Sequence, residues 1–219
     1  VGARLYHVIT DYERFTGDWA RVFQIWKGGL SIWGVVAGGL IAALIVARVK
    51  HVNTFLLTDA IVPGLLVAQA IGRWGNYFNQ ELFGEPTTLP WGLKIDVINR
   101  PLGFESYSQF HPTFLYESIY CLILVAIILW VERNWRLRTG QTSGLYLALY
   151  CFGRFGFENL RIDDARVVLG LRINAWVTLV VMIIGIVWFV GAGRRGKIDP
   201  GRYPESPDPL GSGATAANA

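Results

Sequence analysis

The sequence has little charge and very few cysteine, histidine or methionine residues for its length. Of its 219 residues, 16% are charged and 53% are hydrophobic, with two cysteines, three histidines and one methionine. Soluble domains carry about 25% charged residues, so this balance argues against a soluble domain and indicates an integral membrane protein. Cys121 and Cys151 both lie in apolar segments without metal-ligand spacing, which predicts buried structural thiols.

Several common catalytic motifs are also absent. The sequence has no G-x-S-x-G elbow, no Walker loop, no H-E-x-x-H motif and no cysteine pair, so no standard catalytic or metal-binding loop is indicated. The net charge of +4 and the pI near 9.2 would suit a nucleic-acid partner. The basic residues instead stand at the ends of apolar runs, a distribution typical of membrane proteins. We therefore predict neither a nucleic-acid partner nor a metal site.

The apolar runs predict an all-α, polytopic membrane helix bundle. Each run is close to the ~20 residues that a spanning helix needs, and five complete spans are expected, over residues 30–47, 54–72, 112–131, 144–160 and 173–191. Residues 1–9 resemble the end of another span. Residues 83–110, with three prolines and several glycines, predict a small extramembrane cap with a short strand over 91–96.

Charge predicts the topology. Basic clusters at 48–51, 133–138 and 194–197 fall on one side if the five spans alternate, and the positive-inside rule makes that side cytoplasmic. Residues 73–110 and 161–171 then lie on the opposite side of the membrane. We expect a transmembrane catalytic domain over 1–197 and a disordered cytoplasmic tail over 198–219, which is rich in proline, glycine, serine and alanine.

The segment I-G-R-W-G-N-Y-F-N-Q-E-L-F-G, residues 71–84, places a cation, three amides and a carboxylate at the end of a span. These residues are Arg73, Asn76, Asn79, Gln80 and Glu81. Such groups are costly to desolvate and require partners or water. If the segment stays helical, Arg73, Asn76 and Gln80 share one face. A lone arginine could simply extend its side chain to the membrane–water interface, but the amides and the carboxylate clustered beside Arg73 favour a functional polar site.

A second polar motif is G-R-F-G-F-E-N-L-R, residues 153–161. Arg154, Glu158 and Arg161 fall at i, i+4 and i+7, hence on one helical face. An ion pair that neutralises itself within the bundle is the structural alternative. Because two arginines flank one glutamate, we expect one guanidinium to remain for an anion, and arginine is well suited to gripping phosphate.

A third motif is H-P-T-F-L-Y-E, residues 111–117. Pro112 fits the first turn of a helix, which puts His111 at the entrance and Glu117 inside an apolar helix, where its charge needs a donor. Weaker signals are G-G-L-S-I-W-G at 28–34 and G-A-R-L-Y at 2–6, which adds Arg4. An arginine-rich pocket in the outer half of the membrane suggests an anionic lipid headgroup as ligand. The residues alone leave the reaction open.

The segment over 71–84 closely resembles the signature of the bacterial prolipoprotein diacylglyceryl transferases. The other motifs quoted above follow in the family's order, so that the resemblance covers residues 1–192 and has an actinobacterial character. The chain departs from the family at Trp33, where many members have a histidine. Family members have seven spans, and the chain begins at Val1 with no leader. We therefore expect the first span and most of the second to be missing. The missing part would include a tyrosine-bearing segment near the family's site.

The resemblance implies transfer of the diacylglyceryl group of phosphatidylglycerol to the lipobox cysteine of an exported preprolipoprotein, which releases glycerol phosphate without a cofactor. It implies an enzyme of the bacterial plasma membrane with its active site towards the outer leaflet. Arg73 and Arg154 are expected at the phosphate, and Glu158 is expected to hold Arg154. His111 or Glu81 is the candidate proton acceptor. Asn76 and Glu81 are expected to orient the headgroup. The further phosphatidylglycerol-binding candidates are Asn79, Gly84, Glu158, Arg161 and Arg4.

Two alternatives remain at this stage. The chain could bind or transport anionic phospholipid without chemistry, in which case its polar residues should line a path through both leaflets. The chain could also be inactive without the missing spans.

Overall fold

The computed structural model describes residues 32–163, 165 and 167–198. The chain divides into two compact units, Val1–Thr58 and Asp59–Ala219, which are described separately. In the first unit, helix α2 (Ile32–Val49) is an apolar 18-residue helix with Arg48 in its last turn, where a cation interacts favourably with the helix dipole. The predicted tail lies almost wholly outside the described residues.

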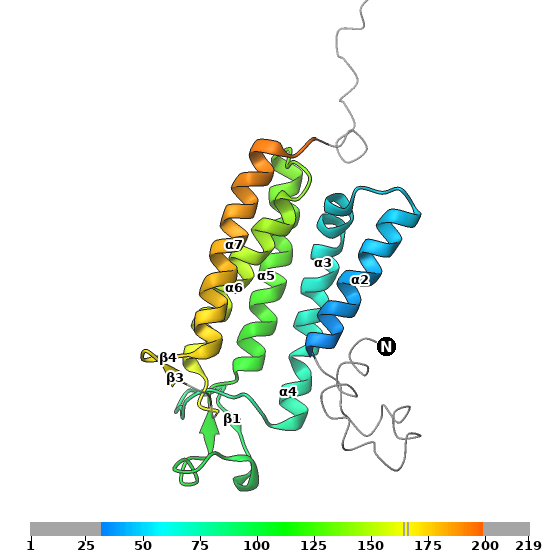
Figure 1. Cartoon of the computed structure of the whole chain (residues 1–219). Helices are drawn as coiled ribbons and strands as arrows, with labels where there is room; N and C mark the ends of the chain where they lie inside the picture. The colour runs from blue at the N-terminus through cyan, green and yellow to red at the C-terminus, as the bar shows by residue number, and fades with distance from the viewer. Residues whose placement is uncertain (1–31, 164, 166, 199–219) are drawn as a thin grey trace, which may run out of the picture. The chain divides into compact units, whose positions relative to one another are not determined.

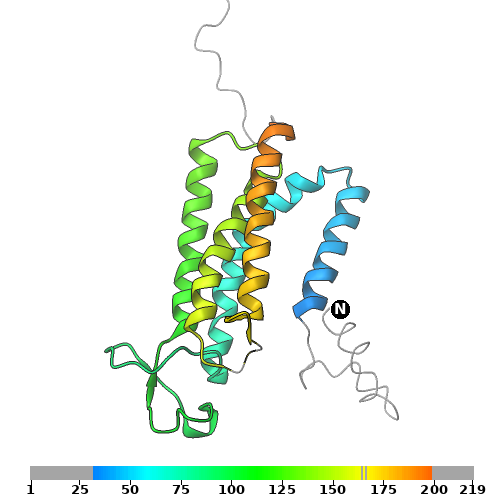
Figure 2. The ribbon, with the colours of Figure 1, turned by 60° about the vertical axis from the view of Figure 1, so that its left-hand side comes forward.

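The second unit contains most of helix α3 (Thr54–Gly72) and all of the later helices. These are α4 (Trp74–Asn79), α5 (Thr113–Asn134), α6 (Gln141–Leu160) and α7 (Ile173–Arg195). Helices α5, α6 and α7 run side by side (Figure 1), and a view turned by 60° shows the same arrangement (Figure 2). The chain is therefore mostly helical, as predicted.

Three stretches in the described part of the chain are long and apolar enough to cross a membrane: Thr54–Asn79, Thr113–Asn134 and Ile173–Arg195. Helix α7 exposes large aliphatic side chains, among them Val180, Ile184 and Val187, and such a surface suits lipid rather than water. The membrane character of the bundle is thus supported, while the number of spans stays a prediction.

One apolar core joins α3, α5 and α6. It consists of the buried side chains of Val62, Leu66 and Ala70 on α3, Cys121, Leu124 and Ile128 on α5, and Tyr146 on α6. Spacings of three and four residues put the α3 set and the α5 set each on one helical face. Both cysteines are free and buried, which confirms the prediction of structural thiols.

Helices α6 and α7 approach each other closely at two glycines. A Cβ atom on Gly144 would lie 2.6 Å from the Phe189 nitrogen, and one on Gly185 would lie 2.6 Å from the Ala148 nitrogen. Any larger residue would therefore push the two backbones apart. Small residues at such crossings are how membrane helices gain packing contacts without a hydrophobic driving force between them.

A buried carboxylate of α3 caps the start of α6. Asp59 is 1% exposed and accepts hydrogen bonds from the Gly140 nitrogen at 2.7 Å and from the Ser143 nitrogen at 2.8 Å. It also accepts a bond from the Ser143 hydroxyl at 2.7 Å. Helix α6 has no acidic residue in its first turn, so Asp59 supplies both the missing acceptor and a negative charge at the positive end of the helix.

The cap between α4 and α5 is small and has its own core. Strand β1 (Leu93–Lys94) pairs antiparallel with β2 (Gln109–Phe110), and a 3-10 helix spans Val97–Asn99. Phe83, Ile95 and Phe110, the last of them in β2, form its buried apolar cluster. The predicted strand within 91–96 is therefore present, although only two residues long.

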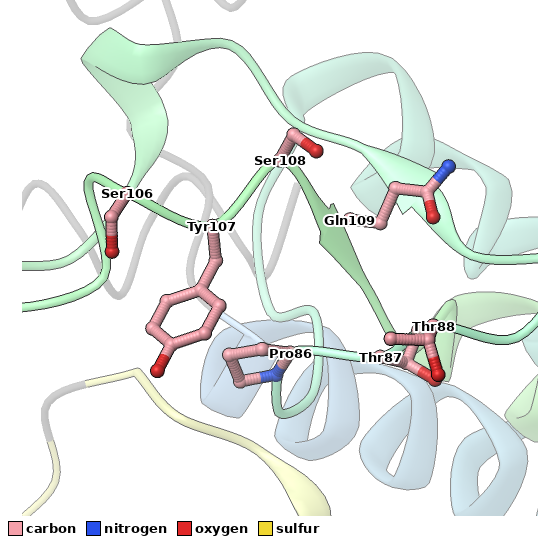
Figure 3. A pocket seen from close by; sticks show the side chains of 7 residues that line it. All are labelled: Pro86, Thr87, Thr88, Ser106, Tyr107, Ser108 and Gln109. Carbon is pink, nitrogen blue, oxygen red and sulfur yellow. The ribbon is translucent and has the colours of Figure 1, made fainter.

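A pocket of about 520 Å³ opens on the cap, lined by residues 86–88 and 106–109. Figure 3 shows that its lining consists mainly of hydroxyl and amide side chains from these two segments. None of the lining side chains carries a formal charge.

A second hairpin, which the sequence did not predict, stands between α6 and α7. Its strands are β3 (Val167–Val168) and β4 (Leu171–Arg172). It lies at the same end of the helices as the cap (Figure 1). The cap, the hairpin and the polar ends of α3, α5 and α6 therefore gather at one end of this unit.

Candidate functional site

The polar segment after α3 is not one continuous helix. Helix α3 ends at Gly72 and α4 begins at Trp74, and the Asn76 nitrogen bonds to the Arg73 oxygen three residues back. Helix α4 then ends at Asn79, and Gln80, which follows it, adopts a left-handed conformation with φ of 49°. The expectation that Arg73, Asn76 and Gln80 share one helical face is therefore wrong for Gln80.

Gln80 faces the cap instead. Its amide nitrogen donates to Asp96 Oδ2 at 3.0 Å, and its amide oxygen accepts from the Asp96 nitrogen at 2.8 Å and from Asn99 Nδ2 at 3.1 Å. These three bonds fasten the end of α4 to the 3-10 helix of the cap. Gln80 thus positions the loop that carries its neighbours.

The loop after α4 is held at both of its ends. Leu82 has a φ of 57°, which is rare for a bulky residue and indicates a conformation enforced by its surroundings. The Leu82 carbonyl accepts a hydrogen bond from the Thr113 hydroxyl. The Gly84 nitrogen donates to the His111 oxygen at 2.9 Å. A Cβ on Gly84 would lie 2.9 Å from His111 Cβ and 3.1 Å from Leu160. Glycine is therefore required where this loop, α5 and α6 meet.

Glu117 joins arginines from two other elements. It is 4% exposed and its carboxylate accepts from Arg73 at 2.8 Å and from Arg154 at 2.9 and 3.0 Å. Arg73 also donates to the Tyr150 hydroxyl at 3.2 Å. The charge of Glu117 thus has the donors that its place in an apolar helix requires, and it holds two guanidinium groups on one carboxylate.

Glu158 forms the second centre of the network. It is fully buried and accepts from Arg154 NH2 at 2.8 Å and from Arg161 NH1 at 3.4 Å. On its other oxygen it accepts from Arg172 Nε and from Asn174 Nδ2, both at 3.1 Å. Arg154 therefore divides its guanidinium between Glu117 and Glu158, and it connects the two centres.

The sequence predicts that one of the two arginines around Glu158 remains for an anion, but Arg161, like Arg154, has acidic partners. Its guanidinium forms two hydrogen bonds with Asp163, at 2.7 and 2.9 Å, besides its contact with Glu158. Asp163 in turn accepts from Arg172 at 2.8 Å. Across the described residues of this cluster, four guanidinium groups face three carboxylates, so one formal positive charge is in excess.

A pocket of about 340 Å³ lies beside this network. Its polar lining is Asn79, Gln80, Glu81, Asn99 and Asp163, and Phe83 and Ile162 add apolar walls. Asn79 Nδ2 donates to Glu81 Oε1 at 3.0 Å. Carboxylate and amide groups of this kind can hydrogen-bond a polyol, because the carboxylates accept and the amides donate.

His111 lies at the junction of the cap and α5. Its Nδ1 is 3.1 Å from the Tyr116 hydroxyl, which also accepts from Trp91 Nε1 at 2.9 Å. The indole can only donate, so the phenol proton remains available for Nδ1, and that arrangement would leave the proton of neutral His111 on Nε2. In the described part of the chain, Tyr116 is the side-chain partner found for this ring.

A narrow recess opens between α5 and α6 next to Glu117. Its lining also includes Tyr120, Cys121, Tyr150, Arg154 and Phe157. Two members of the ion network thus border a space whose other walls are aromatic rings and a thiol. The network therefore has apolar surroundings on this side.

Comparison with known proteins decides the family. The profile of the family described as Prolipoprotein diacylglyceryl transferase matches residues 1–191. The chain belongs to this family. The resemblance seen in the sequence motifs is therefore confirmed.

Curated relatives have the same printed name, phosphatidylglycerol–prolipoprotein diacylglyceryl transferase. The protein of Streptomyces griseus subsp. griseus is 47% identical over 206 residues, which is 92% of this chain and 61% of that protein. Those of Cutibacterium acnes and Bifidobacterium adolescentis are 48% and 47% identical, over 91% and 90% of this chain. The chain spans 69% and 63% of their respective lengths.

Most of the residues singled out from the sequence of this family member lie near the network. Arg73, Arg154, Glu158 and Arg161 belong to it, Asn79 and Glu81 line the adjacent pocket, and Gly84 and His111 meet beside it. Asn76 lies on α4, and no side-chain hydrogen bond to it is found among the described residues. Arg4 and the side chain of Trp33 lie outside the residues that the structure describes.

Sequence reasoning missed four members of the site: Tyr150, Asp163, Arg172 and Asn174. Arg172 directly precedes the apolar run over 173–191, where a basic residue is ordinarily expected beside a membrane span. Asp163 follows a span and suggests only a polar loop. Glu117 was identified as needing a donor but was not placed in the site, because nothing in its motif indicates which arginines reach it.

Asp163 provides a test of the network by pH. Burial alone would raise the pKa of this carboxyl group, but hydrogen bonds and charge from Arg161 and Arg172 outweigh burial and lower it. A folded-state pKa below the unfolded value contributes stability above the unfolded pKa, and that stability is lost as the pH falls through the folded pKa. Asp163→Asn should therefore lower the thermal unfolding midpoint at neutral pH.

The difference in unfolding midpoint between Asp163→Asn and the unchanged chain should shrink as the pH falls below the ordinary aspartate pKa of about 3.9. It should vanish below the pKa that Asp163 has in the folded protein. The measurement is thermal unfolding in detergent for both proteins across this range. An equal loss of stability at every pH would show that Asp163 acts through packing rather than through its charge.

Proposed function

We propose that this chain transfers the diacylglyceryl group of phosphatidylglycerol to the lipobox cysteine thiol of preprolipoproteins. Its family membership and its relatives' names support this reaction. The observation that carries the proposal is the Arg73–Glu117–Arg154 bridge around a buried carboxylate, which joins the ends of α3, α5 and α6. It presents guanidinium groups in fixed positions at the polar end of a membrane bundle.

The reaction is a displacement at carbon. The thiolate sulfur attacks the glycerol carbon that carries the phosphate, a carbon–sulfur bond forms, and the carbon–oxygen bond to phosphate breaks. The products are a thioether and glycerol phosphate, and the thiol proton passes to a base. Thiolate is the competent nucleophile, and the leaving phosphate gains negative charge as the bond breaks.

Fixed guanidinium groups are well suited to the developing charge. Arg73 and Arg154 are held by carboxylates and a phenol before any substrate arrives, so they need no reorganisation when the leaving group departs. Glu158 orients Arg154, and Arg161 extends the positive charge along the same helix end. The excess positive charge of the cluster is the charge that a phosphate would compensate.

The glycerol headgroup fits the adjacent pocket. Asn79 and Glu81 present an amide and a carboxylate to it, with Asn76 on the preceding helix, and Gly84 lets the loop approach α5 and α6 closely. We assign these residues to headgroup orientation. Arg4 is assigned to phosphatidylglycerol binding from its motif alone.

Two residues are candidates for the proton acceptor. His111 could accept a proton at Nδ1 through Tyr116, since these two groups are in hydrogen-bond contact. Glu81 is exposed and lines the headgroup pocket, which would bring a carboxylate near the entering thiol. Because Trp33 stands where many family members have histidine, a histidine at that position does not serve here.

The proposed setting is a bacterial plasma membrane crossed by the five complete spans expected from the sequence. Basic residues at 48–51, 133–138 and 194–197 would face the cytoplasm. The cap, the hairpin and the ion network would face the outer leaflet. Phosphatidylglycerol, lipobox-bearing preprolipoproteins and the bilayer are the partners.

The test is transfer of labelled diacylglycerol from phosphatidylglycerol to a lipobox peptide in nanodiscs, with the Streptomyces griseus relative as the positive control. With the label in the glycerol backbone, the proposal expects the peptide to keep its label after alkaline hydrolysis, because alkali removes the acyl esters and leaves the thioether to glycerol intact. A lipobox peptide with serine in place of cysteine should remain unlabelled. A folded chain that binds phosphatidylglycerol and never labels the peptide would contradict transfer and leave non-catalytic lipid binding or transport.

A further inference from the structure

The hairpin between α6 and α7 has an apolar tip and a polar base. Val167 is 61% exposed, Val168 is 41% exposed and Leu169, at the turn, is 88% exposed. At the base, Arg172 pairs with Val167 across the strands and donates to Glu158, Asp163 and the Arg161 carbonyl. One end of the hairpin is therefore anchored in the ion network, and the other exposes three successive aliphatic side chains.

The turn itself is unfavourable for leucine. Leu169 and Gly170 both have positive φ, at 50° and 78°, which matches the two-residue hairpin turn that favours Asn-Gly. A leucine there is strained because of its Cβ and γ-branch. Its side chain is neither suited to the turn nor buried within the described chain. Its apolar side chain is therefore available to an apolar partner outside the described part of the chain.

The neighbourhood of the hairpin identifies the bilayer as that partner. Trp176 lies in the first turn of α7, a candidate membrane span, and its indole donates to the Val168 carbonyl at 2.9 Å. Tryptophan concentrates at membrane interfaces, where its apolar ring and polar N–H are both satisfied. The hairpin projects sideways at the end of α7 rather than along the helix axis (Figure 1), so its tip is directed along the interface.

A peptide is a poorer match for this surface. The strands are two residues long, which is too short to add a peptide strand with useful hydrogen bonding. The pockets described above are lined by other residues. A convex apolar tip is the shape that enters lipid.

We propose that the tip, Val167–Leu169, inserts into the boundary between headgroups and acyl chains of the bilayer. The hairpin thereby holds Arg172, and with it Arg161 and Asp163, at the depth of the lipid phosphates. This is a membrane-binding surface additional to the spanning helices, and it does not depend on the transfer reaction. Its partner is the phospholipid bilayer itself.

The test places an environment-sensitive fluorophore on Leu169→Cys in nanodiscs that contain lipids with a nitroxide near the top of the acyl chain. Ile98→Cys is the matched control, because Ile98 is 90% exposed and lies on the 3-10 helix of the cap. The unmodified chain, whose own cysteines are buried, is labelled in parallel as the background. Circular dichroism and size-exclusion chromatography check the fold of both variants.

The proposal predicts blue-shifted emission from the Leu169 site and lipid quenching several-fold stronger than at the Ile98 site. A water-soluble quencher should show the reverse order. Equal lipid quenching at the two sites would overturn the proposal. The proposal would also be overturned if the fluorophore at position 169 showed water-like emission until a lipobox peptide was added, because the tip would then bind peptide.

Discussion

Glu117→Ala is expected to destabilise the protein by about 3–5 kcal/mol, the loss typical when one partner of a buried ion pair is removed. The carboxylate is 4% exposed, and the two side chains that it pairs, Arg73 and Arg154, are 18% and 19% exposed. Its loss would leave two largely buried guanidinium groups without their shared acceptor. It would also remove the link that joins α3 to α6 through α5.

The measurement is unfolding in detergent, with Glu85→Ala as the matched control. Glu85 is exposed on the cap, and surface substitutions usually change stability by less than about 0.5 kcal/mol. Glu117→Gln keeps the shape of the side chain and one acceptor oxygen, so its loss of stability should lie between those of Glu117→Ala and Glu85→Ala. If Glu117→Ala were as stable as the control, the network would not hold the helices together.

The second large effect is expected at Arg154. Arg154→Lys should lower kcat for diacylglyceryl transfer by about 10²–10³, the range seen when a fixed hydrogen-bond donor to a developing anion is removed. The guanidinium of Arg154 bonds Glu117 with NH1 and Glu158 with NH2. Lysine keeps the charge but has one compact donor group, which cannot span both carboxylates and orient towards phosphate.

Arg136→Lys is the control for this change. Arg136 is exposed beyond the far end of α5, and its replacement should leave both kcat and KM unchanged. Rates are compared in nanodiscs after the fold is checked. A variant in which KM rises and kcat is retained would assign Arg154 to ground-state lipid binding rather than to the leaving phosphate.

The helices of this chain could be predicted because membrane spans are strongly constrained. A run of about 20 apolar residues has few structures open to it other than a helix, since the bilayer satisfies no backbone polar group. The Arg154–Glu158 contact was also predictable, because residues four apart on a helix are neighbours. Both inferences use only local spacing along the chain.

The rest of the site depends on contacts between distant segments. Glu117 and Arg154 are 37 positions apart, and Glu158 is 14 positions from Arg172, which lies in the second strand of the hairpin. No local periodicity encodes such pairs. The left-handed turn at Gln80 was likewise unpredictable, because it depends on hydrogen bonds with Asp96 and Asn99 in the cap. A single helical face was therefore predicted where the chain in fact turns.

Arg73 and Arg154 are proposed to act together on the leaving phosphate because Glu117 holds both. The most direct measurement is kcat for transfer in Arg73→Lys, Arg154→Lys and the double variant. Residues that act as a unit show non-additive effects. We therefore expect kcat of the double variant to be little lower than that of the worse single variant, with KM nearly constant in all three. Fully additive losses in kcat, or losses confined to KM, would contradict it.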